Sequence, residues 1–172
     1  MKEKLLVGML GKTQSGKTHT WNTIFEKKEV KTGRNLRKLT LNEKGDSVDV
    51  FLVNRSAQKR HMDISQIITV DQPKIVLCSL QYAKEIVKTL KYFVENDYFL
   101  YIHWLNPGYN DPHDAPLFYD FDVLNYIFSA DSMIGVRNGK KEPAERVREI
   151  RDFIYAWSRE RGLLKEKYAL KL

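Results

Sequence analysis

Residues 11–18 restrict the fold of this chain more than any other part, because two glycines five positions apart are followed at once by Lys17 and Thr18. The stretch reads Gly-Lys-Thr-Gln-Ser-Gly-Lys-Thr. An apolar run at 5–10 precedes it as a buried strand would, and the large apolar residues of 19–25 follow it at helical spacing. This order of strand, glycine-containing loop and helix predicts an α/β fold that begins with a phosphate-binding turn.

Each fixed position of this loop has a physical reason. Gly11 and Gly16 permit backbone angles and a close approach that a Cβ would block, so that consecutive N–H groups can point at phosphate oxygens. Lys17 is expected to reach the β and γ phosphates, and the Thr18 hydroxyl to ligate Mg²⁺. The alternative is an ordinary turn with an incidental lysine. The predicted nucleotide-binding residues are Gly11, Lys12, Thr13, Gln14, Ser15, Gly16, Lys17, Thr18 and His19.

The rest of the chain alternates predicted strands and helices. Short polar residues at 42–46 fit a turn, so the apolar runs that flank it predict an antiparallel hairpin. Alternation over the remainder predicts a three-layer α/β fold, with a mainly parallel sheet, one antiparallel hairpin strand and helices on both faces. No linker rich in Pro, Gly or Ser divides residues 1–172, which are expected to form a single domain. The first helix is expected to reach Lys28; strands are predicted at 37–41, 48–53, 75–80, 98–102 and 132–136, and helices at 83–96, 121–128 and 143–162.

Composition and charge limit the class of protein. The formal net charge is +7, and the excess of Lys and Arg lies in 1–60 and 137–172, whereas 61–136 carries more Asp and Glu. Solvated faces explain this pattern, and nucleic acid stays an alternative partner without a recognisable reading motif. The single Cys78 excludes an intramolecular disulfide and is expected to be a buried thiol. The apolar run at the N-terminus is too short for a signal sequence or membrane span, so a cytoplasmic location is expected.

The chain resembles the P-loop NTPase superfamily over residues 5–25, and its element order is similar to that of the small Ras-like GTPases. In that family a buried strand ends in Asp-x-x-Gly, and a following Gln orients the attacking water. Here Asn54 stands in place of the magnesium-holding Asp, and Ala57 in place of the Gly. Gln58 matches the water-orienting position, so the resemblance implies catalytic roles for Lys17 and Gln58. Thr32 lies where such proteins keep a metal-binding switch threonine.

The guanine-reading Asn-Lys-x-Asp pattern is missing, since 106–109 reads Asn-Pro-Gly-Tyr. ATP is therefore favoured as the ligand and GTP is the alternative, each with Mg²⁺. The magnesium-holding acid is also missing from the ends of the buried strands. Either Asp63 or Asp111 supplies it, or catalysis is slow, or the protein binds nucleotide without turnover.

Three functions stay open at this point. The first is a Mg-dependent NTP hydrolase or nucleotide switch. The second is a small-molecule or nucleotide kinase, because Asn54-Arg55-Ser56 is similar to the Glu-Arg-Ser stretch of deoxynucleoside kinases, although Asn replaces their catalytic base. The third is a non-catalytic nucleotide-binding module that recruits a protein partner through the acidic, aromatic loop 109–120. A kinase lid would need several arginines and lysines, and the candidates are expected instead to form a solvated helix face: Lys140, Lys141, Arg146, Arg148 and Arg151.

Overall fold

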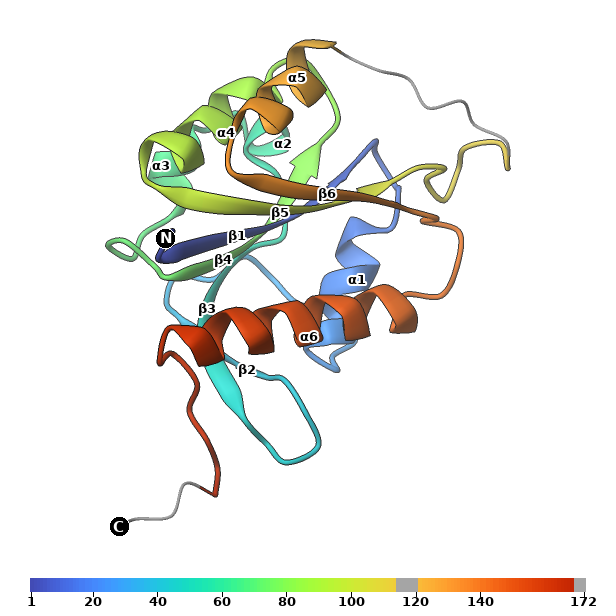
Figure 1. Ribbon diagram of the computed structural model, residues 1–172. Coiled ribbons are helices and arrows are strands. Elements are labelled where there is room, and N and C mark those ends of the chain that lie inside the picture. Colours follow the sequence, from blue (N-terminus) through green and yellow to red (C-terminus); the bar gives the residue numbers. More distant parts are fainter. Residues whose placement is uncertain (114–120, 169–172) are drawn as a thin grey trace.

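The computed structural model describes residues 1–113 and 121–168 and shows a twisted sheet between two layers of helices (Figure 1). Within the described residues the sheet has six strands in the order β2-β3-β4-β1-β5-β6, and β2 is its antiparallel member. The bounds are β1 (Lys4–Gly11), β2 (Arg37–Thr40), β3 (Ser47–Val53), β4 (Ile75–Gln81), β5 (Tyr98–Leu105) and β6 (Ser132–Arg137).

Helices cover both faces of this sheet. α1 (Lys17–Ile24) and α6 (Ala144–Glu160) pack on one face, where Trp21, Ile150 and Ile154 join its core. The other face carries α2 (Ala57–Arg60), α3 (Ile64–Ile67), α4 (Ile86–Glu95) and α5 (Phe121–Ser129). The predicted α/β class, with a mainly parallel sheet, an antiparallel hairpin and helices on both faces, is therefore confirmed.

β1 lies at the centre of the sheet because both of its faces are apolar. Leu6 and Leu10 point into the core under α4 and α5, whereas Leu5, Val7 and Met9 point into the core under α1 and α6. All five side chains are buried, as expected for a strand with parallel neighbours on both sides. β4, and not β3, is the neighbour of β1 on the hairpin side.

The first helix is shorter than predicted and ends at Ile24 instead of Lys28. The cause is Asn22, whose side chain donates to the Lys28 carbonyl (3.0 Å) and accepts from the Val30 N–H (2.9 Å). The Asn22 side chain thereby satisfies the Lys28 carbonyl and the Val30 N–H outside a helix, so the helix does not continue through these residues. The chain then runs back beside the end of β3, where Gly33 N–H donates to the Leu52 carbonyl.

The structure also bears on two smaller predictions, the burial of the Cys78 thiol and the expectation that no segment spans a membrane. Cys78 is fully buried in β4, and burial raises the pKa of its thiol, so the expected buried thiol is confirmed. None of the described helices combines the length and apolar character needed to cross a membrane.

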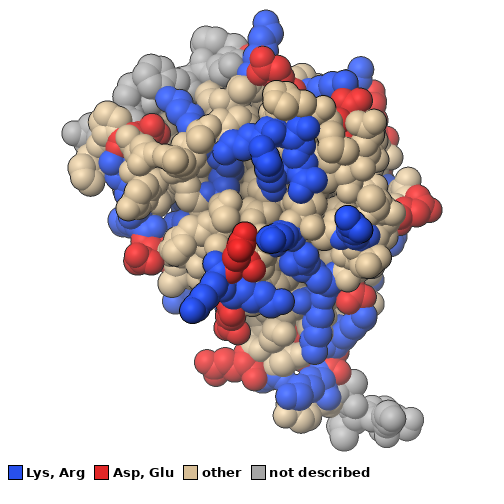
Figure 2. Space-filling model, turned by 180° about the vertical axis from the view of Figure 1, so that it is seen from behind, with Lys and Arg blue, Asp and Glu red and all other residues tan. Residues whose placement is uncertain are grey.

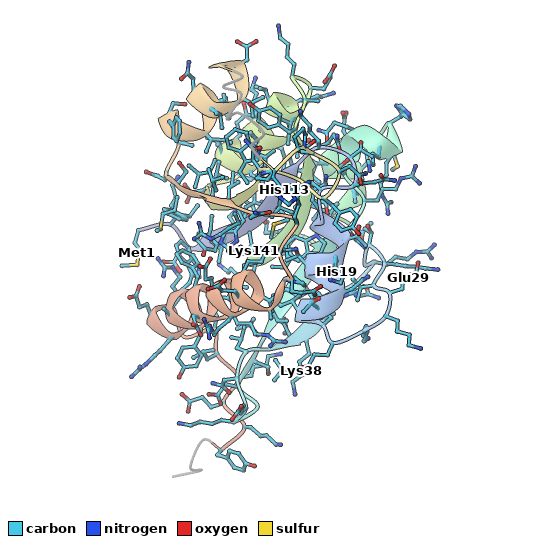
Figure 3. All side chains as sticks on the ribbon, turned by 90° about the vertical axis from the view of Figure 1, so that its right-hand side faces the viewer. Met1, His19, Glu29, Lys38, His113 and Lys141 are labelled. Atoms are coloured by element: carbon cyan, nitrogen blue, oxygen red, sulfur yellow. The ribbon has the colours of Figure 1, made fainter. Side chains whose placement is uncertain are left out.

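The parallel arrangement decides where a site can form. The C-terminal ends of β1, β3, β4, β5 and β6 open on the same edge of the sheet, where loops after different strands meet. Figure 3 views the molecule from the side on which these loops lie, and His19 and Lys141, which come from distant parts of the chain, are close together there.

Candidate functional site

The loop between β1 and α1 folds around the ammonium group of Lys17. Its Nζ donates to the carbonyls of Gly11 (2.9 Å) and Lys12 (2.6 Å) and to Ser15 Oγ (3.2 Å). Gly16 adopts a φ of 106°, in the left-handed region that glycine tolerates, so the chain turns sharply into the helix. The result is a compact loop with the amino group of Lys17 at its centre and a helix N-terminus behind it.

A pocket of about 560 Å³ opens directly above this loop. The predicted residues from Gln14 to His19 all line it, and Lys59, Tyr109 and the turn after β6 complete its walls. Tyr109 is 67% exposed and offers an aromatic surface. The remaining predicted loop residues lie beneath or beside the pocket: Gly11 and Lys12 accept from Lys17 as described above, and Thr13 Oγ1 accepts a hydrogen bond from Gln81 (3.2 Å).

Two further loops hold Ser15, which lies in the loop between β1 and α1, in place. Gly139 approaches so closely that a Cβ there would lie 2.3 Å from the Ser15 carbonyl oxygen, and a Cβ on Gly108 would lie 2.9 Å from Ser15 Cβ. Gly139 N–H also donates to the Pro107 carbonyl (2.8 Å). The conformation of the loop 12–16 therefore depends on the turns that follow β5 and β6.

Thr18 meets Asn54 at the end of β3. Thr18 Oγ1 donates to Asn54 Oδ1 (3.1 Å), while Asn54 Nδ2 donates to the Val30 carbonyl (2.7 Å). Magnesium bound octahedrally at about 2.1 Å has neighbouring ligand oxygens about 3 Å apart. The Thr18 and Asn54 oxygens have that separation, and both are hard donors, so this pair fits a magnesium ion that takes its other ligands from phosphate and water.

The residues that could have supplied a carboxylate lie elsewhere. Asp63 forms an ion pair with Lys88 (2.6 Å), and Asp111 Oδ2 accepts from the Gly108 N–H (2.9 Å). In the described part of the chain no group of three or more His, Cys, Asp and Glu is arranged to hold a metal. Of the described acidic residues, Glu142 alone lines the pocket, and its side chain is 92% exposed.

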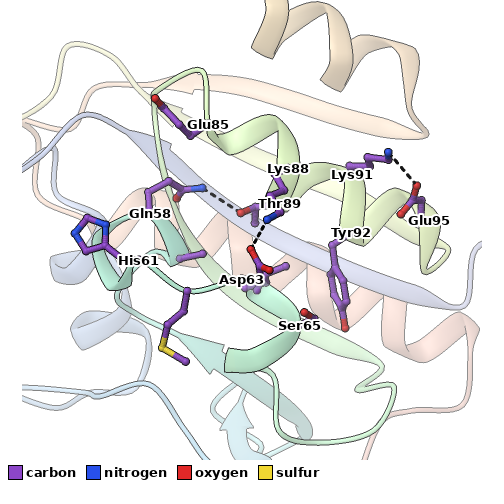
Figure 4. Close-up of a pocket in the computed structure, with 13 residues that line it drawn as sticks. Gln58, His61, Asp63, Ser65, Glu85, Lys88, Thr89, Lys91, Tyr92 and Glu95 are labelled. Carbon is purple, nitrogen blue, oxygen red and sulfur yellow. Dashed lines mark hydrogen bonds and ion pairs between the residues drawn. The ribbon is translucent and has the colours of Figure 1, made fainter.

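Gln58 and Lys17 are not brought together. Gln58 lies on α2 and donates to Thr89 Oγ1 (3.0 Å) on α4, inside a second pocket of about 710 Å³ between these helices (Figure 4). Its neighbour Lys59 lines the pocket above the loop between β1 and α1 instead. Thr32 accepts hydrogen bonds from the N–H groups of Asn54 (3.1 Å) and Arg55 (3.4 Å), so it supports the Asn54 backbone.

Arg146 is a site residue that sequence reasoning missed. It was predicted to belong to a solvated face, yet it is only 4% exposed. Its Nε donates to Thr20 Oγ1 (2.8 Å), its Nη1 donates to the Lys141 carbonyl (3.0 Å), and its Nη2 is buried without a partner among the described residues. The signal was its spacing, because Arg146, Ile150 and Ile154 recur every four residues along the buried face of α6.

The predicted contact loop 109–120 is only partly visible. Residues 114–120 lie outside the described residues. In the described part, Asn110 donates from Nδ2 to Gln14 Oε1, and Asp111 closes the turn at Gly108. The start of this loop therefore packs against the loop between β1 and α1.

The pKa of Lys17 is lowered from 10.5 to about 7, first by burial and then by the neighbouring charge of Lys59. Between these two pH values the unfolded chain binds one more proton than the folded chain. Stability should therefore rise with pH over this window, by up to about 1.4 kcal/mol per pH unit. Urea unfolding from pH 7 to 9.5 should show this gain in the wild type and lose it in Lys17→Met. Equal pH profiles of the wild type and Lys17→Met would contradict the lowered pKa of the buried Lys17.

Comparison with known proteins assigns neither a family nor a function to this chain. Neither a scan against protein-family models nor a search of curated proteins gave a match. The site must therefore be interpreted from its own geometry.

Proposed function

We propose that the protein binds a nucleoside triphosphate with Mg²⁺ through residues 11–19, and that ATP is preferred over GTP. The observation that carries the proposal is the position of Lys17, whose ammonium lies at the centre of the loop while Thr18 and Asn54 present two oxygens beside it. A triphosphate entering the pocket would accept from Lys17 Nζ, and its magnesium ion would lie against Thr18 and Asn54. The charge of the walls supports an anionic ligand, because Lys59, Lys140 and Lys141 line the pocket and Glu142 is the one acid among its described lining residues.

We further propose that the protein is a slow NTP hydrolase or a nucleotide switch. Asn54 offers a neutral oxygen where hydrolases of the resembled superfamily carry a carboxylate, which would hold magnesium less firmly. The Gln58 side chain is engaged with Thr89 in the other pocket, so the proposal assigns it no contact with an attacking water in this conformation. Binding would then be strong relative to turnover. In such a protein, whether nucleotide is bound matters more than how often it is hydrolysed.

Calorimetric titration of the purified protein with ATP and with GTP, each with and without Mg²⁺, tests the binding proposal. Binding that needs Mg²⁺ and is tighter for ATP is the expected result. Phosphate release measured with and without candidate acceptors then separates the alternatives: slow release alone supports the hydrolase, acceptor-dependent transfer supports a kinase, and tight binding without release supports a binding module. Absence of binding to either nucleotide would overturn the proposal.

Asn54→Asp should have two opposite effects. The new carboxylate strengthens magnesium binding, and we expect the Mg²⁺ dependence of ATP binding to shift about tenfold to lower concentration, which corresponds to about 1.4 kcal/mol. The substitution also removes the donor to the Val30 carbonyl, and we expect it to lower the free energy of unfolding without nucleotide by about 1–3 kcal/mol.

Asn96→Asp is the matched control for this experiment. Asn96 Nδ2 donates to the Tyr92 carbonyl (2.8 Å) at the end of α4, so the same type of hydrogen bond is lost far from the loop. The control should lose stability in urea unfolding without any change in Mg²⁺ dependence. A Mg²⁺ response of Asn54→Asp equal to that of Asn96→Asp would remove Asn54 from the proposed metal site.

A further inference from the structure

A separate cavity of about 610 Å³ lies between the segment 29–34 and the segment 54–69. It is next to the phosphate loop, because its lining residues Asn54 and Arg55 also line the small pocket against Lys17 and Thr18. The cavity is distinct from the pocket above the loop, since the two share no lining residue among those described, although Asn54, the proposed magnesium ligand, lines the cavity. We call it the basic cavity, because most of its charged lining residues are lysine or arginine.

Side-chain hydrogen bonds hold the two walls of the basic cavity together. Thr32 Oγ1 accepts from Asn54 N–H, and Asn54 Nδ2 donates to the Val30 carbonyl. At the other end, Thr69 Oγ1 donates to the Arg34 carbonyl (2.7 Å). The cavity is therefore a defined feature of the fold and not a gap between unconnected loops.

The lining is strongly cationic. Lys31, Arg34, Arg55 and Arg60 line it, and Glu29 brings the one carboxylate among the described lining residues. None of these four cations forms an ion pair with another described residue, whereas Lys84, just before α4, and Lys91 on α4 are both paired with carboxylates. Arg60 Nε is in addition buried without a hydrogen-bond partner in the described part of the chain. Figure 2 shows Lys and Arg side chains gathered near the middle of the face turned away from Figure 1, with few acidic side chains among them.

We propose that the basic cavity binds a second ligand that carries phosphate, beside the nucleotide site and without requiring bound nucleotide. Arg55 donates to the Lys59 carbonyl (3.2 Å), but no described carboxylate is paired with any of the four. Like charges without a counter-charge repel one another, and a phosphate group with two negative charges would relieve this repulsion. Guanidinium groups bind phosphate through paired N–H donors, and three of the four cations are arginines. Ile67 and Met62 add apolar lining for the body of the ligand.

The phosphate group of this ligand belongs either to a phosphorylated small molecule or to the backbone of a nucleic acid. Two probes distinguish them: inorganic pyrophosphate, and a short fluorescent single-stranded oligonucleotide. Both are titrated into Lys17→Ala protein, in which the nucleotide loop is disabled, by calorimetry and by anisotropy. The use of Lys17→Ala protein separates the proposed nucleotide binding from the proposed phosphate binding in the basic cavity. If the wild type failed to bind ATP, the proposed function would be wrong, but the probes could still bind the basic cavity of Lys17→Ala protein.

The decisive variant combines Arg34→Gln with Arg60→Gln in the Lys17→Ala background. Neither guanidinium has a hydrogen bond or ion pair to another described residue, so the variant should melt at the same temperature as its parent. We expect its affinity for the bound probe to fall about tenfold to a hundredfold, as for the loss of charge-assisted hydrogen bonds. Binding should also become less dependent on salt, since fewer cations contact phosphate.

The matched control combines Lys84→Gln with Lys91→Gln, which removes the same charge from α4 and the turn before it and should leave affinity unchanged. Binding of the oligonucleotide alone identifies nucleic-acid backbone as the ligand, and binding of pyrophosphate, with or without the oligonucleotide, identifies a phosphorylated small molecule. The proposal is overturned if neither probe binds Lys17→Ala protein, or if the control loses as much affinity as the arginine variant.

Discussion

Lys17→Ala is expected to weaken binding of Mg-ATP about a hundredfold, since charge-assisted hydrogen bonds contribute about 1.5–3 kcal/mol each and every 1.4 kcal/mol is tenfold in affinity. The ammonium of Lys17 is the group that the loop carbonyls surround, and it is only 6% exposed. Alanine removes the charge and leaves the glycines and the helix N-terminus in place. Calorimetric titration with Mg-ATP measures the loss.

The same variant should not be less stable at pH 6, which separates loss of binding from loss of folding. Burial disfavours the charged form of Lys17, so its removal relieves a cost that is fully present below the lowered pKa of about 7. Lys91→Ala is the control, because Lys91 is exposed and paired with Glu95 on α4 (3.6 Å). If Lys17→Ala bound Mg-ATP as tightly as Lys91→Ala, the assignment of the phosphate loop would be wrong.

Gly139→Ala is expected to disrupt the site from a different loop. A Cβ at this position would lie 2.3 Å from the Ser15 carbonyl oxygen and 3.1 Å from the Pro107 carbonyl oxygen. Both are backbone atoms, so the turn after β6 must move away from the phosphate loop. We expect a loss of about 1–3 kcal/mol in the free energy of unfolding, as for overpacking of a close contact. ATP affinity should fall at least about tenfold, because Ser15 then loses its support.

Gly135→Ala on the neighbouring strand β6 is the matched control. Its Cβ would approach the guanidinium of Arg137 (2.7 Å to Nη1), the end of a flexible side chain that can move aside. Urea unfolding and calorimetry with Mg-ATP should therefore show a small change for Gly135→Ala and a large one for Gly139→Ala. Similar results for the two alanine variants would mean that the turn after β6 does not support the phosphate loop.

Local patterns predicted most of the secondary structure. The apolar runs at 5–10 and 75–80 are long enough, and apolar enough on both faces, to require the middle of a parallel sheet, where β1 and β4 lie. The turn residues at 42–46 predicted the antiparallel pair, and Asn42 indeed closes it by accepting from Gly45 N–H. The end of α1 could not be predicted, because it depends on hydrogen bonds from Asn22 to residues six and eight positions later.

The candidate site was only partly predictable for the same reason. Lys17, Thr18 and their loop are neighbours in sequence, so their spacing alone indicates their chemistry. Alignment by position also suggested Gln58, but the direction of its side chain depends on how α2 packs against α4. Arg146 lies 126 residues from Thr20, its hydrogen-bond partner, and no local pattern links the two.

The sequence by itself determined the phosphate-loop pattern, the alternation of strands and helices, and the absence of a carboxylate at Asn54. These properties follow from residue identity and from spacings of a few residues, which set backbone freedom and the faces of helices and strands. Only the tertiary structure decided that Asn54 meets Thr18, that Arg146 lies under the loop, and that Gly139 supports Ser15. Each of these contacts joins loops at one edge of the sheet, and the order of the strands, not the local sequence, brings those loops together.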